Sequence, residues 1–174
     1  MKRNVAIIAL LTAFLIFING CGKKNEYILD EKTFFLVMTN MQYYPEQYED
    51  AKIEFDCFTY DITDVEGITY RCIVRKCSSG YGCNCGKDTV IGFLAENVDL
   101  PEPKNQSENT NDKMWIHVDG KLAGIAKKKI RIYSYTADGE INKNVIETID
   151  FLSFNVENYS IIEDYSKLNF YVTK

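Results

Sequence analysis

The chain has little of what several common kinds of functional site require. Its 174 residues include three prolines and a single histidine, His117. One histidine excludes the paired histidines of a zinc protease, and a Ser-His-Asp triad would need a serine that no motif marks. The net charge of −5 leaves no excess of lysine and arginine for neutralising phosphates. We therefore expect no enzymatic activity and no nucleic-acid partner, and we interpret His117 as a structural residue.

Long apolar runs are also scarce, and the one present lies at the N-terminus. Lys2 and Arg3 precede the apolar residues 5–18, and Gly20 and Cys21 follow shortly after. A transmembrane helix needs about 20 apolar residues, so this run is short for a span and has the flanks of an export signal. The cysteine directly after Gly20 makes the segment resemble the signal of bacterial lipoproteins.

This resemblance implies where the protein is located. In lipoproteins of this kind the cysteine, here Cys21, takes a diacylglycerol and becomes the new N-terminus. We predict a signal peptide at 1–20, a lipidated tether at 21–29 and one domain at 30–174, anchored in the cell membrane by its lipid and facing outside the cytoplasm. The alternative, an uncleaved N-terminal anchor helix, places the domain on the same side.

Composition indicates a folded domain rich in sheet. Hydrophobic residues make up 46% of the chain and aromatic residues 13%, and aromatic and β-branched residues favour strands. One helix is predicted ahead of the strands, because Phe34, Val37, Met38 and Met41 recur at helical spacing after a capping residue, Asp30.

A series of short strands should follow a single turn at Pro45. Apolar and polar residues alternate from Ile53 to Cys57, which predicts an extended segment with one buried face and makes Cys57 a core residue. The same pattern predicts strands at 68–77, 89–96, 114–123, 128–135 and 147–157, turns at Glu66-Gly67, Gly120 and Asp138-Gly139, and a last strand or short helix between Tyr159 and Val172. The polar connection from Asn97 to Asp112 is either a binding loop or a tolerated surface excursion.

These elements predict a mainly β fold with an N-terminal helix, in the α+β class. We expect a small OB-like β-barrel with extra C-terminal strands, and a β-sandwich is the alternative. The chain also resembles the OB-like C-terminal domain of an uncharacterised bacterial family labelled as permease subunits. The residues that carry this resemblance are Pro45-Glu46-x-Tyr48, Arg71, Asp88, Gly92 and Trp115-Ile116-x-Val118-x-Gly120-x-Leu122. It implies the fold and a transporter or envelope protein as partner.

Cysteine is concentrated in one segment. Four of the five cysteines beyond Cys21 lie at Cys72, Cys77, Cys83 and Cys85, and Gly80, Gly82 and Gly86 are interspersed among the last of them. Glycine permits tight turns, so thiols from separate positions could converge there.

Three interpretations of this cluster stay open. Exported proteins permit disulfides, and the candidates are Cys77, Cys83 and Cys85. A soft-metal site for zinc or copper(I) would use the thiolates of Cys77, Cys83 and Cys85, and the fourth ligand would be Cys72, Asp88 or His117. Thiol redox chemistry would draw on Arg75, Lys76 and Lys87, whose charges lower the pKa of a nearby thiol.

Together these observations predict a lipid-anchored, extracytoplasmic lipoprotein that acts as a binding or accessory module. The alternative is a soft-metal-binding or thiol-redox protein that uses the loop from Cys77 to Cys85.

Overall fold

The structure is a computed structural model, and it describes residues 26–77, 89–136 and 140–172. Its elements are β1 (Glu26–Leu29), α2 (Phe34–Tyr43), the 3-10 turn η1 (Pro45–Gln47), β2 (Lys52–Thr63), β3 (Thr69–Cys77), β4 (Thr89–Glu96), β5 (Trp115–Leu122), β6 (Lys128–Tyr135), β7 (Ile141–Phe151), β8 (Ser153–Ile161) and β9 (Tyr171–Val172). The protein is mainly β, with one α-helix and a mixed seven-stranded sheet. Within these ranges no helix has the length and apolar character to cross a membrane.

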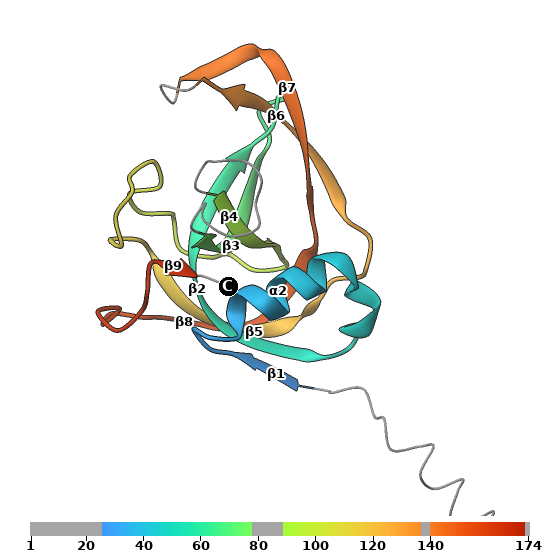
Figure 1. Cartoon of the computed structure of the whole chain (residues 1–174), viewed down its shortest axis with the longest axis vertical. Helices are drawn as coiled ribbons and strands as arrows, with labels where there is room; N and C mark the ends of the chain where they lie inside the picture. Colours follow the sequence, from blue (N-terminus) through green and yellow to red (C-terminus); the bar gives the residue numbers. More distant parts are fainter. Residues whose placement is uncertain (1–25, 78–88, 137–139, 173–174) are drawn as a thin grey trace, which may run out of the picture.

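Five strands of the sheet pair around a closed ring (Figure 1). β2, β3 and β4 form an antiparallel meander, and β4 then pairs in parallel with β8. β8 pairs antiparallel with β5, and β5 returns to β2, which closes the ring. β1 and β9 add parallel pairs at the start of β2 and at the end of β3.

The inside of the ring is filled by apolar side chains from every strand. Phe55, Phe93 and Phe154 lie with ring centroids 5.2–5.9 Å apart. α2 packs its buried face, which consists of Phe34, Met38 and Met41, against the same core. Burying these aromatic rings supplies much of the stabilisation of the fold.

A second apolar cluster lies on the other side of the sheet. Phe58, Cys72, Val74 and Trp115 are buried there beneath residues of the hairpin and of the C-terminal segment. Trp115 donates its indole N–H to the carbonyl of Asn111 at 2.9 Å, so its polar atom is satisfied. Successive residues of a strand point to opposite faces of the sheet, so the strands contribute side chains to two separate cores.

Arg75 fills the place where β2 and β3 stop pairing, which we call the seam of the ring. The pairing of these strands stops at Phe58 and Val74, and Arg75 follows directly with a side chain that is 2% exposed. Its guanidinium donates to Glu31 at 2.9 Å and to the carbonyls of Asp56 and Asn169. The charge therefore joins the N-terminal turn, β2 and the C-terminal segment at one point.

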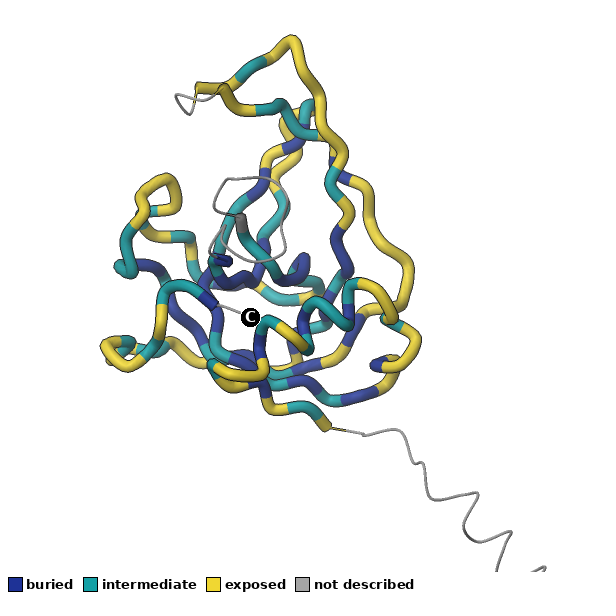
Figure 2. The backbone as a smooth tube through the Cα atoms, in the orientation of Figure 1, coloured by how far each residue is buried: buried dark blue, intermediate teal, exposed yellow. Residues whose placement is uncertain are grey.

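The hairpin of β6 and β7 is inserted between β5 and β8 and extends from the ring at the top of Figure 1. Much of it is exposed, in contrast to the ring (Figure 2). Ile141, Val145 and Ile146 are 56%, 46% and 47% exposed. At its base the hairpin buries Ile130 and Phe151 in the second cluster, and Ile132 and Ile149 pack against it.

Most predicted elements are present, with two differences at the N-terminal half. The predicted helix and the turn at Pro45 are confirmed. Residues 26–29 form β1 instead of a tether, because they pair with β2 and bury Leu29. The turn predicted at Gly120 is wrong, because Gly120 lies inside β5 where a Cβ would overlap the carbonyl oxygen of Asn155.

The C-terminal half differs at one further point. The predicted strand 147–157 is two strands, β7 and β8, that meet at Leu152. Leu152 is fully buried and its carbonyl accepts a hydrogen bond from Leu94 at 3.0 Å, which fixes the change of direction. The predicted turn at Asp138-Gly139 lies outside the described residues.

Candidate functional site

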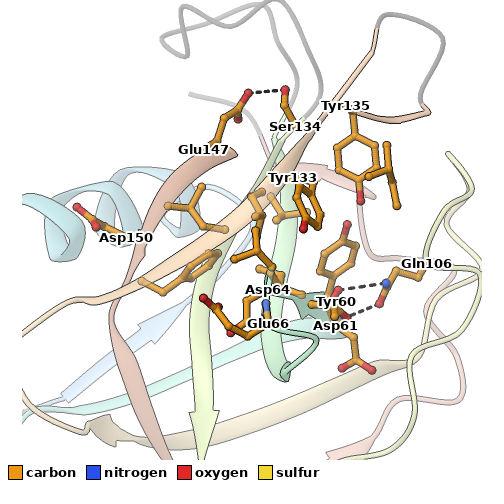
Figure 3. Close-up of a pocket in the computed structure, with 18 of the residues that line it drawn as sticks. Tyr60, Asp61, Asp64, Glu66, Gln106, Tyr133, Ser134, Tyr135, Glu147 and Asp150 are labelled. Carbon is orange, nitrogen blue, oxygen red and sulfur yellow. Dashed lines mark hydrogen bonds between the residues drawn. The ribbon is translucent and has the colours of Figure 1, made fainter. Parts of the chain in front are cut away.

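A groove lies between the hairpin and the ring (Figure 3). It has a volume of about 1270 Å³. Its walls come from the β2–β3 hairpin, the start of β4 and the inner side of β6 and β7. These segments are far apart in the sequence, and the ring and its inserted hairpin bring them together.

Three tyrosines form the aromatic part of the groove. Figure 3 shows Tyr60, Tyr133 and Tyr135 close to one another, from β2 and β6. Burial, followed by the neighbouring Tyr135 and Cys72, raises the pKa of Tyr60 above its ordinary value, so the phenol is neutral at physiological pH. Among the described residues no hydrogen bond involves these three hydroxyls, which leaves them available to a ligand.

The wall on the ring side is held by a polar network. Arg71 donates to Asp61 at 2.5 Å and to the carbonyls of Leu100 and Pro101 at 2.7 Å each. Gln106 accepts from the backbone N–H of Asp61 at 2.5 Å and donates to its carbonyl at 3.1 Å. The connection from Asn97 to Asp112 is therefore docked on β2, and its Gln106 lines the groove.

Asp64 fixes the β2–β3 turn at one end of the groove. It accepts hydrogen bonds from the N–H groups of Glu66 and Ile68 at 2.9 and 2.8 Å and from the hydroxyl of Tyr70 at 3.1 Å. Burial raises the pKa of this carboxyl, but the hydrogen bonds from Ile68, Tyr70 and Glu66 outweigh it, so the pKa lies below its ordinary value. Gly67 completes the turn with φ of 85°.

The wall on the hairpin side carries carboxylates without cationic partners. Glu147 accepts a hydrogen bond from the hydroxyl of Ser134 at 2.6 Å. No basic side chain of the described residues forms an ion pair with Glu147 or Asp150. Lys143 is the one basic residue in the lining.

Two of the described cysteines, Cys57 and Cys72, do not resemble reactive thiols. Cys57 is fully buried in the inner core, which confirms it as a core residue. Burial raises its pKa well above the ordinary value, although the nearby Arg75 acts in the opposite direction. Burial likewise raises the pKa of Cys72 to about 12. Thiols with such pKa values are poor nucleophiles at neutral pH, so Arg75 does not activate Cys57.

The predicted metal and disulfide residues are only partly described. Cys72 and Cys77 lie on one strand but belong to different apolar clusters, so the structure does not bring them together. Cys83, Cys85 and Asp88 lie outside the described residues, as does the predicted lipidation site, Cys21. In the ranges that are described, no three His, Cys, Asp or Glu side chains are arranged to hold a metal ion.

His117 lies on β5 between two carboxylates of β2. Its Nδ1 is 2.8 Å from Oδ1 of Asp56 and its Nε2 is 3.3 Å from Oε1 of Glu54. Both ring nitrogens thus have partners within the sheet, which supports a structural role. Ser160 is its cross-strand neighbour on β8 but makes no hydrogen bond to it among the described residues.

Comparisons with protein-family models, with curated proteins and with solved structures found no match to this chain. The resemblance to the permease-subunit family stays a prediction.

The sequence did not indicate the groove. Tyr60 and Tyr133 lie far apart in the sequence, and only the insertion of the β6–β7 hairpin between β5 and β8 brings them into one groove. The signal that was present is the cluster Tyr133-Ser134-Tyr135, where two aromatic residues lie at the end of β6 and are not fully buried.

Proposed function

We propose that the five-strand ring is a small barrel of the OB type. Three consecutive antiparallel strands, a parallel pair between β4 and β8, and the return through β5 to β2 match a five-stranded Greek-key barrel. The closed pairing favours this fold over a sandwich, whose two sheets would have separate edges.

We propose that the protein is a lipid-anchored, extracytoplasmic binding module and that the groove is its ligand site. The observation that carries this proposal is the position of the groove. It lies between the turn joining β2 to β3 and the hairpin inserted between β5 and β8. In OB barrels these two connections, together with the second and third strands, are the places where ligands bind.

The anchor and the groove are compatible in space. Five peptide steps from Cys21 to Glu26 span at most about 18 Å, so a lipid on Cys21 would keep β1 close to the membrane. β1 and the hairpin lie at opposite ends of the molecule along its longest axis (Figure 1). The groove would therefore face away from the membrane, where an envelope partner or a ligand can reach it.

The ligand site can be tested by hydrogen exchange on the full chain in a non-ionic detergent. The chain is incubated with a panel of short peptides, oligosaccharides and nucleotides, and exchange is measured by mass spectrometry. We expect at least one compound class to slow exchange in residues 60–67 and 132–135 together. Protection confined to other segments, or none from the whole panel, would refute the groove as the site.

The anchor is tested separately. Cells that express the full chain are labelled with radioactive palmitate, and Cys21→Ala is compared with Cys57→Ala. We expect label in the native protein and in Cys57→Ala but not in Cys21→Ala. Equal labelling of Cys21→Ala, or no labelling of the native chain, would contradict the anchor and leave the groove to be judged on its own.

A further inference from the structure

The charge of the groove narrows the class of ligand. Its lining contains five acidic side chains and one basic one: Asp61, Asp64, Glu66, Glu147 and Asp150 against Lys143. Arg71 and Arg131 neutralise two of the acids, and backbone N–H groups of its turn solvate Asp64. Glu147 and Asp150 form no ion pair among the described residues, although Lys129 is the cross-strand neighbour of Asp150.

The aromatic rings in the same groove add a second preference. Tyr133 and Tyr135 are partly and largely exposed, and their rings lie in the same lining as the unpaired acids. The face of a tyrosine ring attracts a cation, and carboxylates nearby reinforce that attraction. A phosphate or a carboxylate in the same place would be repelled by both.

The size and floor of the groove indicate an extended ligand. Its volume of about 1270 Å³ is larger than the roughly 300–1,000 Å³ of most small-molecule pockets. Apolar side chains line it between the charges, among them Val90, Ile132 and Ile149. Lysine and arginine bury their methylene stems on such surface while their charged ends reach carboxylates.

We propose that the groove binds an extended, cationic peptide segment of a partner protein, with its lysine or arginine side chains along the lining that contains the tyrosines and the carboxylates Glu147 and Asp150. This inference rests on the proposed ligand site, and it specifies the chemistry of what occupies it.

The probes are three molecules of similar length. The first is a fluorescein-labelled dodecapeptide that alternates lysine and glycine, the second replaces lysine with glutamate, and the third is the uncharged hexasaccharide cellohexaose. Binding of the peptides to the full chain is followed by fluorescence anisotropy, and binding of the sugar by calorimetry. We expect the lysine peptide to bind best and to weaken as salt rises from about 50 to 500 mM, because salt screens exposed charges.

Variants then locate the binding. Glu147→Gln with Asp150→Asn should raise the Kd of the lysine peptide about fivefold. The control, Glu157→Gln with Glu163→Gln, changes the net charge equally at exposed positions outside the groove lining and should leave the Kd within about twofold. Tyr135→Leu should raise the Kd about threefold. Tyr135→Phe keeps the aromatic ring and should leave the Kd unchanged.

The outcomes separate the inference from the function on which it rests. Equal losses in the charge variant and its control mean that only net charge matters, and they overturn the inference. Groove protection by cellohexaose or the glutamate peptide, with weaker binding of the lysine peptide, overturns the cationic ligand and keeps the groove as the site. Failure of the lysine peptide to bind at all overturns the inference, whatever the wider panel shows.

Discussion

The seam of the ring and the junction of the hairpin with the β2–β3 turn each contain an arginine–glutamate pair, but water reaches the two pairs to different extents. Arg75 is 2% exposed at the seam, whereas Arg131 on β6 and its partner Glu66 are each 55% exposed. A buried charge must be matched by groups of the protein, while an exposed charge is solvated and stays available. Composition alone therefore does not distinguish side chains that hold this fold from those left for a ligand, and exposure does.

The largest effect should come from removing the seam charge. Arg75→Met takes the cation from Glu31 and from the face of Trp115, whose ring centre is 4.9 Å from the guanidinium carbon. Because Glu31 is 30% exposed and can be partly hydrated, we expect a loss of about 3 kcal/mol in the free energy of unfolding, at the low end for a broken buried pair. Urea unfolding followed by circular dichroism measures it.

The matched control for the seam is Arg131→Met in the hairpin. It makes the same substitution at an exposed pair and should cost less than about 1 kcal/mol. Similar losses at Arg75 and Arg131 would remove the distinction between the two regions.

A smaller loss of stability should follow from a steric clash instead of a lost charge. Gly120→Ala places a Cβ against the carbonyl oxygen of Asn155 on β8, and backbone atoms cannot move aside cheaply. We expect a loss of about 2 kcal/mol, seen as a lower Tm. Lys121→Ala, one residue further on the same strand and 46% exposed, should stay within about 0.5 kcal/mol. An unchanged Tm for Gly120→Ala would show that β5 and β8 are not packed as tightly at this position as the structure indicates.

The β2–β3 turn offers an effect that depends on pH. Because the pKa of Asp64 is lowered in the folded protein, its charge stabilises the fold above its unfolded pKa of about 3.9, and the benefit is lost as pH falls through the folded pKa. We expect Asp64→Asn to be less stable than the native chain at pH 7 and the gap to narrow below about pH 4. Unfolding in urea at a series of pH values checks this, and a gap that stays constant would contradict it.

The smallest effect should come from the groove itself. Glu147→Gln with Asp150→Asn removes two exposed charges that form no ion pair among the described residues. We expect the free energy of unfolding to change by less than about 0.5 kcal/mol. A loss as large as that of Arg75→Met would mean that these acids support the fold and are not available to a ligand.

Local patterns predicted the elements well. The helical spacing of Phe34, Met38 and Met41 and the alternation in β2 both depend on neighbouring residues, and the structure buries those residues as expected. The break at Leu152 was not predictable in this way, because apolar residues continue on either side of it and a contact with β4 causes the bend.

The site depends on pairings that local patterns do not contain. Arg75 stands beside cysteines in the sequence, where the redox interpretation uses its charge, but the contacts of its guanidinium with Glu31, Asp56 and Asn169 depend on pairings far along the chain. Tyr60 meets Tyr135 because the hairpin is inserted between adjacent strands, which no spacing along the chain reveals.

The points where the hairpin leaves and rejoins the ring lie side by side. Leu122 at the end of β5 pairs with Phe154 near the start of β8, so the ring is closed whatever the intervening segment does. The entropy of closing a loop rises only slowly with its length. Related chains could therefore lengthen, shorten or rewrite the exposed part of the hairpin beyond Ile130 and Phe151 at little cost to the barrel, and could change what they recognise while keeping the same scaffold.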